Sequence, residues 1–199
     1  DDFLSRSERY EELRNFPGKS GTSMLSSDLH FGTIGPLEII NRVKSDSHSQ
    51  QMFIRQLAWR DWYAHLLFAT PEIIFKSANP IYEKIQWGNN LLDFDLWKNG
   101  KTGYPIVDAG MRELRATGFM HNRVRMITAS FLIKDLLIDW RLGEKYFRRH
   151  LIDGDIAQNV GNWQWVAGTG FDAAPYFRVF NPVLQSKKFD PAGEYIRSW

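Results

Sequence analysis

The segment NRVRMITASFLIKDLLIDW, residues 122–140, predicts a buried α-helix and points to a helical fold. From residue 124 onward it is the most apolar part of the chain, although Lys134, Asp135 and Asp139 interrupt it. The chain has no charge-free run of 18 apolar residues, so we expect no membrane-spanning helix.

Helical patterns also dominate the chain outside this segment. We predict one helix that begins at Pro36 and a second from about Gln50 to Ala69. Two more are predicted from Pro105 to near Gly118 and from Gly143 to Leu151. Frequent glycine and proline residues after position 151 predict an irregular C-terminal part. No segment alternates convincingly between apolar and polar residues, and no GxGxxG motif occurs. The predicted fold class is therefore all-α.

The composition is that of an ordinary globular protein. Among 199 residues, 43% are hydrophobic and 24% charged, which excludes a disordered chain and favours one domain, residues 1–199. The absence of cysteine excludes a disulfide scaffold and suits a reducing compartment, so we expect a cytoplasmic protein. The histidines lack metal-ligand spacing, so we predict no metal. Both ends look like cuts, and we interpret the chain as a fragment truncated at both ends.

Two polar clusters in the first third of the chain are candidates for binding. Thr22, Ser23, Met24, Leu25 and Ser26 follow Gly21 and place hydroxyl and N–H groups before a predicted helix, which suits an anion but also a simple capping turn. The second cluster shares one face of the helix predicted over residues 50–69. Its side chains can stack on bases and bind phosphate, or they can pack in the core while the arginine extends to solvent. This cluster comprises Gln56, Trp59, Arg60 and Tyr63.

Two further clusters lie in the second half. Asn122, Arg125 and Met126 share a helix face, and an arginine that opens a buried helix needs a carboxylate or an anionic ligand. Arg123 points elsewhere, because it lies about 200° from Arg125 around the helix. Residues 153–165, DGDIAQNVGNWQW, concentrate carboxylates, amides and two tryptophans. Buried polar groups need partners, so this segment is a poor choice for core alone.

Together these clusters resemble the FAD-binding helical domain of the DNA photolyase and cryptochrome family. The strings GKTGYPIVDA (100–109), MHNRVRMITASFL (120–132) and DAAPYFRVFNP (172–182) are highly specific to that family. The resemblance extends from about Tyr10 to Trp199 and is strongest to bacterial class I cyclobutane pyrimidine dimer photolyases. It implies FAD as cofactor, DNA containing pyrimidine dimers as partner, and light-driven repair of those dimers by a monomeric lyase.

The resemblance also implies the FAD-binding residues. Asn159 corresponds to the asparagine that faces flavin N5 and favours the reduced flavin, and Arg125 and Asp153 correspond to an ion pair beside the flavin ring. Trp163, Trp140 and Trp87 correspond to the tryptophans that pass electrons to excited flavin. The remaining cofactor positions are Tyr10, Thr22, Ser23, Met24, Leu25, Ser26, Phe53, Gly154 and Asp155.

On the lesion side, the resemblance implies phosphate contacts from Arg14, Arg123 and Arg178. Trp59, Trp165 and Met126 correspond to side chains that surround a dimer flipped out of the duplex. We also expect Arg60, Tyr63 and Asn122 to contact DNA. The complete DNA-contacting set is Arg14, Gln56, Trp59, Arg60, Tyr63, Asn122, Arg123, Met126, Trp165 and Arg178.

Two departures from the family pattern matter. Gln56 stands where the family often has a glutamate that hydrogen-bonds the dimer, and we expect its amide to retain lesion recognition. The N-terminal α/β domain, which would bind an antenna chromophore, is absent from these 199 residues. The main alternative is a cryptochrome-type blue-light photoreceptor. A (6-4) photolyase fits less well, because the expected histidines are missing from the lesion pocket. A generic helical DNA-binding module fits less well, because the net charge is only +2.

Overall fold

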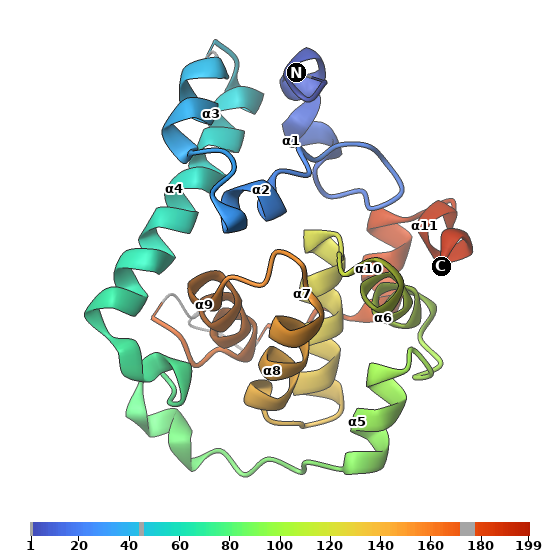
Figure 1. Cartoon of the computed structure of the whole chain (residues 1–199). Helices are drawn as coiled ribbons and strands as arrows, with labels where there is room; N and C mark the ends of the chain where they lie inside the picture. Colours follow the sequence, from blue (N-terminus) through green and yellow to red (C-terminus); the bar gives the residue numbers. More distant parts are fainter. Residues whose placement is uncertain (1, 44–45, 172–177) are drawn as a thin grey trace.

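The computed structural model describes residues 2–43, 46–171 and 178–199, and these residues form helices joined by loops, with no strand among them (Figure 1). The all-α prediction is confirmed. Short 3₁₀ helices cover Leu4–Arg9, Pro71–Ile74 and Pro80–Lys84. The α-helices are α1 (Tyr10–Leu13), α2 (Ser26–Phe31), α3 (Pro36–Arg42), α4 (His48–Ala69), α5 (Leu91–Lys98), α6 (Pro105–Thr117), α7 (Asn122–Ser130), α8 (Trp140–His150), α9 (Ile156–Ala167), α10 (Pro182–Phe189) and α11 (Glu194–Ser198).

Local capping signals place several predicted helices correctly. Helix α3 begins at Pro36, and α6 begins at Pro105 and ends before Gly118, which has a positive φ of 71°. Helix α4 starts two residues earlier than predicted, because Ser47 and Gln50 form a capping box there. The Ser47 hydroxyl accepts a hydrogen bond from the Gln50 N–H at 3.2 Å, and Gln50 Oε1 accepts one from the Ser47 N–H at 3.1 Å.

The prediction of one continuous helix over residues 122–140 is wrong. Helix α7 ends at Ser130, a π-helical turn follows over Phe131–Asp135, and Leu137 has a positive φ of 52°. The sequence pattern does not reveal the break, because the first three residues of the turn, Phe131, Leu132 and Ile133, are apolar and buried like those of a core helix. Trp140 opens the next helix, α8, where the Asp139 carboxylate accepts a hydrogen bond from the Arg141 N–H at 2.9 Å.

The prediction of an irregular chain after residue 151 is also wrong, because α9, α10 and α11 lie there. Pro182 is the first residue of α10, a position where its missing N–H has no consequence. Gly161 lies inside α9, and a Cβ at this position would collide with the ring of Tyr63 on α4. The glycine therefore allows close approach of two helices and does not break α9.

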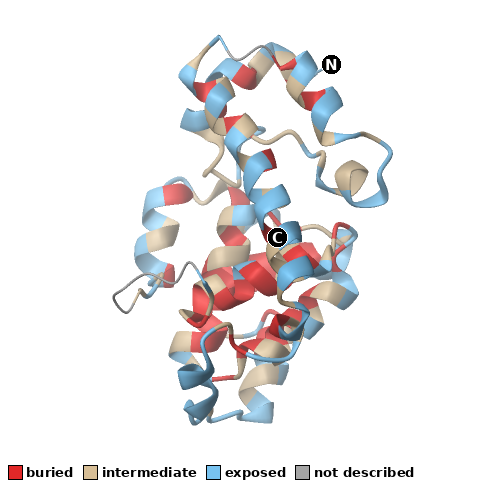
Figure 2. Cartoon of the chain, turned by 90° about the vertical axis from the view of Figure 1, so that its left-hand side faces the viewer, coloured by how far each residue is buried: buried red, intermediate tan, exposed pale blue. Residues whose placement is uncertain are grey.

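Two hydrophobic cores are joined by α4, which runs along one side of the molecule (Figure 1). The larger core is formed by buried residues between Ile73 and Tyr195, and it contains the fully buried Trp97 and Trp140. The smaller core includes Phe53 of α4 and Tyr10 of α1, whose ring centroids lie 5.2 Å apart. Figure 2 shows most buried residues in the lower half and a smaller group in the upper half.

The string at residues 100–109 forms a loop, residues 100–104, and the first five residues of α6. The carboxylate of Asp108 accepts hydrogen bonds from the backbone N–H and hydroxyl of Thr102, both at 2.7 Å, and from the Gly103 N–H at 3.0 Å. Gly100 and Gly103 have φ values of 61° and 84°, which favour glycine. These contacts fix the entry to α6.

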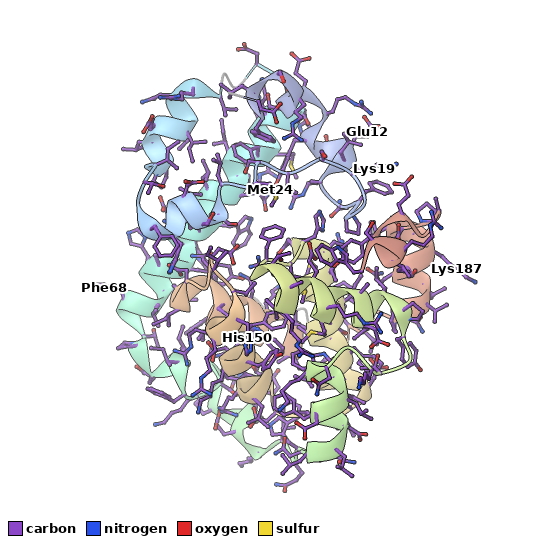
Figure 3. All side chains as sticks on the ribbon, turned by 45° about the vertical axis from the view of Figure 1, so that its right-hand side comes forward. Glu12, Lys19, Met24, Phe68, His150 and Lys187 are labelled. Atoms are coloured by element: carbon purple, nitrogen blue, oxygen red, sulfur yellow. The ribbon has the colours of Figure 1, made fainter. Side chains whose placement is uncertain are left out.

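Some large apolar side chains are exposed on the surface. Phe68 is 90% exposed near the end of α4 and lies at the outer edge of the molecule (Figure 3). Within the described ranges, no helix combines the length and the apolar character needed to cross a membrane.

Candidate functional site

A cavity of about 520 Å³ lies where α4, α7, α8 and α9 meet, with Ser26 of α2 at its edge. It collects fourteen residues that the sequence predicted as functional, from segments far apart in the chain. They are Ser26, Gln56, Trp59, Arg60, Tyr63, Asn122, Arg125, Met126, Asp153, Gly154, Asp155, Asn159, Trp163 and Trp165.

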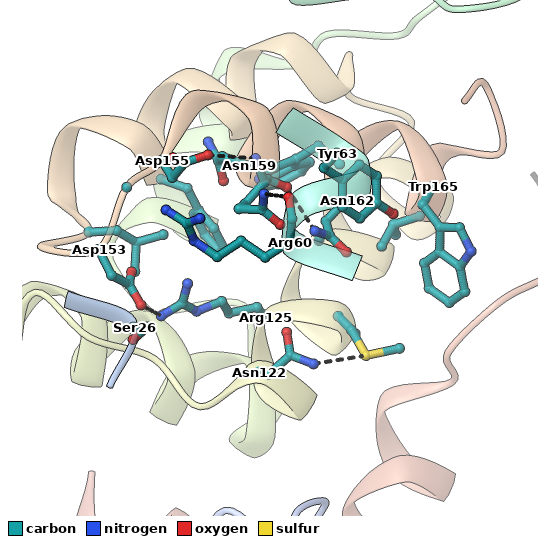
Figure 4. Close-up of a pocket in the computed structure, with 18 of the residues that line it drawn as sticks. Ser26, Arg60, Tyr63, Asn122, Arg125, Asp153, Asp155, Asn159, Asn162 and Trp165 are labelled. Carbon is teal, nitrogen blue, oxygen red and sulfur yellow. Dashed lines mark hydrogen bonds and ion pairs between the residues drawn. The ribbon is translucent and has the colours of Figure 1, made fainter. Parts of the chain in front are cut away.

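The predicted ion pair forms one side of this cavity (Figure 4). Arg125 Nη2 lies 2.8 Å from Asp153 Oδ2, and Arg125 Nε donates to the Met120 carbonyl oxygen at 2.7 Å. The Asp153 side chain is only 2% exposed, and its Oδ1 atom is buried without a hydrogen-bond partner among the described residues. A buried carboxylate oxygen in this state needs a donor, which a ligand in the cavity can supply.

Helix α9 lines the cavity with amides. Asp155 caps its start, and the Asp155 carboxylate accepts a hydrogen bond from the Gln158 N–H at 2.9 Å. Gln158 Nε2 donates to the Arg60 carbonyl oxygen at 2.8 Å, which ties α9 to α4. Asn162 Nδ2 donates to the Gln158 carbonyl oxygen at 2.8 Å. Because these residues are three or four positions apart, they share one helix face.

Asn159 is held by a buried carboxyl group behind the cavity. Its Nδ2 atom donates to the backbone oxygen of Glu144 at 2.9 Å and to Glu144 Oε1 at 3.0 Å. Both amide hydrogens are therefore directed toward Glu144, and the amide oxygen accepts no hydrogen bond from the described residues. Burial raises the pKa of Glu144, and Arg148, whose Nε lies 3.2 Å away, opposes that rise.

Aromatic side chains and a methionine form the more exposed part of the cavity. Trp59 is 40% exposed, and its ring centroid lies 6.2 Å from that of Tyr63. Trp165 packs beside Phe180 at 6.1 Å, and the guanidinium of Arg178 lies 5.0 Å from the Trp165 ring centroid. Accessible aromatic faces beside a cation are suited to stacking on nucleobases.

Arg14 and Arg123, two predicted phosphate contacts, lie outside the residues that line the cavity. Arg14 Nη2 donates to Gln56 Oε1 at 3.1 Å, and Arg123 Nη2 donates to Asn15 Oδ1 at 2.7 Å. Burial and the charge of Arg14 lower the pKa of Arg123. Gln56 Nε2 donates to the Met52 carbonyl oxygen at 3.1 Å, so both ends of this amide are engaged within the protein.

Several predicted cofactor residues do not line this cavity. Tyr10 and Phe53 are buried in the smaller core, and Ser23 and Leu25 line a separate cavity of about 210 Å³. Met24 has a φ of 59° and is 54% exposed. The structure therefore brings only Ser26 of residues 22–26 to the large cavity.

The predicted electron-transfer tryptophans lie in or against the larger core. Trp163 is 3% exposed, and its ring contacts those of Phe147 at 5.0 Å and Trp97 at 6.3 Å. Trp140 is fully buried and Trp87 half-buried. A Cβ at Gly143, one helical turn after Trp140, would collide with the Trp163 ring, so Trp163 packs directly against α8.

The sequence did not single out Glu144, Gln158 or Asn162 as site residues. Gln158 and Asn162 lie within the amide-rich segment 153–165. Their spacing from Asp155, which places all three on one helix face, could have indicated them. Glu144 carried no signal, because its role depends on the packing of α8 against α9. The string at 172–182 falls mostly on residues outside the described ranges, and only its part from Arg178 onward is described.

Comparison with known proteins identifies the family. Residues 53–199 match the model of the FAD binding domain of DNA photolyase. The chain belongs to this photolyase family. A deoxyribodipyrimidine photo-lyase of Escherichia coli strain K12 is 50% identical over 197 residues, which cover 96% of this chain and 42% of that protein. A deoxyribodipyrimidine photo-lyase of Agrobacterium fabrum is 50% identical over 203 residues, which cover 99% of this chain and 42% of that protein.

Solved structures of photolyases and a cryptochrome are similar as well. A crystal structure of a bacterial class III photolyase from Agrobacterium tumefaciens has a TM-score of 0.95 and 50% identity, covering 100% of this chain and 42% of that one. A cryptochrome from Synechocystis has a TM-score of 0.90 and 39% identity, and the match covers 98% of this chain and 42% of that one. The chain thus spans about two fifths of the length of these relatives.

The cofactor of this photolyase domain is FAD, and the cavity fits it chemically. The unpartnered Asp153 Oδ1 can accept a hydrogen bond from a ring N–H or a hydroxyl group. Arg60 and Arg125 supply positive charge, and Asn159 supplies an amide oxygen. The aromatic surfaces of Trp163 and Phe147 complete a site for a flat, polar-edged ring.

Proposed function

We propose that the protein to which this chain belongs is a deoxyribodipyrimidine photo-lyase, which repairs cyclobutane pyrimidine dimers in DNA with light. The single observation that carries this proposal is one cavity with a buried polar side and an exposed aromatic side. Asp153, Arg125 and Asn159 belong to the first, and Trp59 and Trp165 to the second. Relatives that are about 50% identical bear this enzyme's name, which supports the proposal.

When bound and reduced, FAD supplies the light-driven transfer of one electron that opens the dimer's cyclobutane ring and is then returned. In this account Arg125 and Asp153 hold the cofactor, with Asp153 Oδ1 accepting a hydrogen bond from it. Asn159, whose amide is oriented by Glu144, would offer its amide oxygen to the flavin. Trp163, Trp140 and Trp87 carry electrons inward from the surface.

The exposed side of the cavity would receive the lesion. A dimer pairs and stacks poorly, so extruding it from the duplex costs less than extruding normal bases. Trp59, Trp165 and Met126 would surround the flipped dimer. Arg14, Arg123 and Arg178 would contact the flanking phosphates, and Arg60, Tyr63 and Asn122 would line the path between the two sides.

Several finer assignments belong to the same proposal. Residues 1–199 would act as one cofactor- and lesion-binding unit of a monomeric, cytoplasmic enzyme. The subtype would be bacterial class I, to which the resemblance of the sequence is strongest. A class III photolyase is as similar in sequence as the E. coli relative, so phylogenetic placement of the full-length sequence tests the subtype. Grouping with class III enzymes would overturn it.

A cryptochrome-type photoreceptor is the second candidate, because the Synechocystis cryptochrome shares this fold at 39% identity. Binding of the full-length, FAD-loaded protein to matched oligonucleotides with and without one thymine dimer distinguishes the two. A photolyase binds the dimer-containing strand more tightly in the dark. Equal affinity for both strands would favour the photoreceptor.

A further inference from the structure

Gln56 is placed by two hydrogen bonds that define how its amide points. Its Oε1 accepts from Arg14 Nη2 at 3.1 Å, and its Nε2 donates to the Met52 carbonyl oxygen at 3.1 Å. Rotating the amide by 180° would set NH₂ against a guanidinium and oxygen against a carbonyl, so both bonds would be lost. Gln56 Oε1 is thus a neutral hydrogen-bond acceptor for Arg14.

Within the described part of the chain, neither Arg14 nor Arg123 has a carboxylate partner. Among the described residues, no ion pair includes either arginine, and their hydrogen-bond partners are the neutral side chains of Gln56 and Asn15. Arg14 lies 5.1 Å from the Tyr10 ring centroid, and Arg123 lies 4.3 Å from that of Phe189.

The two carboxylates of α1, which directly precedes Arg14 in the chain, have other partners. Glu12 pairs with Arg9 at 3.1 Å, and Glu11 lies 3.6 Å from His48. Arg123 also keeps a buried Nε atom without a hydrogen-bond partner. The two guanidinium groups are close enough for the charge of Arg14 to lower the pKa of Arg123. They form an uncompensated cationic pair.

We propose that Gln56 sets the affinity for the DNA backbone, by leaving the charges of Arg14 and Arg123 uncompensated for a phosphate. A glutamate at position 56 would place a carboxylate oxygen at ion-pair distance from Arg14 and cancel one of the two charges. Gln56 then acts through Arg14 as a positioning residue. This inference rests on the proposed binding of DNA, but not on repair.

The test is the salt dependence of DNA binding by the full-length, FAD-loaded protein. The probe is a dye-labelled single-stranded oligothymidylate without a lesion, whose binding is measured by fluorescence anisotropy over a series of salt concentrations. Because neutralising one phosphate contributes about 0.7 to the log–log slope for single strands, Gln56→Glu should weaken binding at low salt and reduce the slope by about that amount.

Two matched variants separate charge from shape. Gln51→Glu adds the same charge at an exposed position of α4 and should change the slope much less. Gln56→Met removes the hydrogen bonds but adds no charge, and should keep the parent slope. Gln56→Glu should also have a higher Tm than the parent at low salt, a difference that shrinks as salt rises, because the new ion pair relieves repulsion between the arginines.

The inference is overturned if Gln56→Glu keeps the parent slope, or if Gln56→Met lowers the slope equally. A loss of affinity confined to dimer-containing DNA, with an unchanged slope, would also overturn it in favour of a direct base contact by Gln56. Repair assays on the same proteins are read separately. A lowered slope in Gln56→Glu without repair by the parent supports the inference and counts against the photolyase. Repair by the parent with an unchanged slope in Gln56→Glu supports the photolyase and overturns the inference.

Discussion

The side-chain nitrogen of Asn159 lies 3.0 Å from Oε1 of Glu144 and 2.9 Å from its backbone oxygen, so a buried carboxyl group on α8 fixes an amide on α9 that lines the cavity. This contact links the chemistry of the site to the packing of two helices. It also gives Asn159 a defined orientation, which a surface amide would lack.

Asn159→Asp should lower the reduction potential of bound FAD. The variant puts a second carboxyl group beside Glu144, and the two will share a proton at lower pH. We expect a fall on the order of 60 mV, about a tenfold change in a one-electron equilibrium, that grows as pH rises. Spectroelectrochemical titration measures it. Asn162→Asp, on the same helix face, is the control, and an equal shift in both variants would contradict the assigned position of Asn159.

Trp163→Phe should block photoreduction of oxidised FAD and leave repair by chemically reduced enzyme largely intact. Trp163 lines the cavity and packs on α8, whereas phenylalanine preserves most of the packing but is far harder to oxidise. Absorbance under blue light with an external reductant follows the reaction. Trp62→Phe, a change at a 37% exposed position outside the large cavity, should behave as the parent does. Unchanged photoreduction in Trp163→Phe would remove it from the electron path.

Asp153→Asn should weaken FAD retention and cost about 2 kcal/mol of stability. It removes the charge that compensates Arg125, and the loss of a buried partner costs more than the loss of an exposed one. The dissociation rate of FAD and the unfolding midpoint report the two effects. Asp61→Asn is the matched change at a 60% exposed carboxylate, 3.9 Å from Arg60, and should do little. If both variants retain FAD equally, Asp153 does not hold the cofactor.

Acid should destabilise the fold through His121. Burial and the charges of Arg125, Arg123 and Arg14 lower the pKa of His121 to about 4 from an ordinary 6.5. Between these values the unfolded chain binds more protons than the folded one, so stability falls as pH drops from about 6.5 to 4, by about 3 kcal/mol. Protonation would also spoil the cap of α7, because His121 Nδ1 accepts from the Arg123 N–H at 3.2 Å.

Denaturant titrations across this pH range test the His121 prediction. His121→Asn keeps a capping acceptor and should flatten the pH dependence, whereas the exposed His65→Asn should leave it unchanged. Burial raises the pKa of Glu113, whose contribution has the opposite sign and remains in both variants. A parent whose stability is as high at pH 4 as at pH 6.5 would contradict the account.

Local chemistry explains where the sequence predicted structure well. Pro36, Pro105 and Gly118 mark helix ends through their own backbone preferences, so they need no tertiary information. The break at residues 131–139 is different, because apolar side chains fill a π-helical turn as well as a helix. The presence of Gly161 wrongly predicts an irregular chain for a related reason. The Tyr63 ring that excludes a Cβ at this position belongs to α4, about a hundred residues away in the chain.

The candidate site follows the same division. Helical spacing alone grouped Gln56, Trp59, Arg60 and Tyr63, and the structure places all four at the cavity. The Arg125–Asp153 pair came from the family resemblance, and its geometry is present. Glu144 could not be predicted, because only the contact between α8 and α9 gives it a role.

The central claim is that this cavity supports light-driven repair, and one measurement tests it most directly. Full-length protein with reduced FAD is mixed with an oligonucleotide that carries one thymine dimer, and restored thymines are quantified after blue light and after an equal time in the dark. The account predicts restored thymines only in the illuminated sample. Illuminated protein that holds reduced FAD, binds the oligonucleotide and restores no thymines would contradict it.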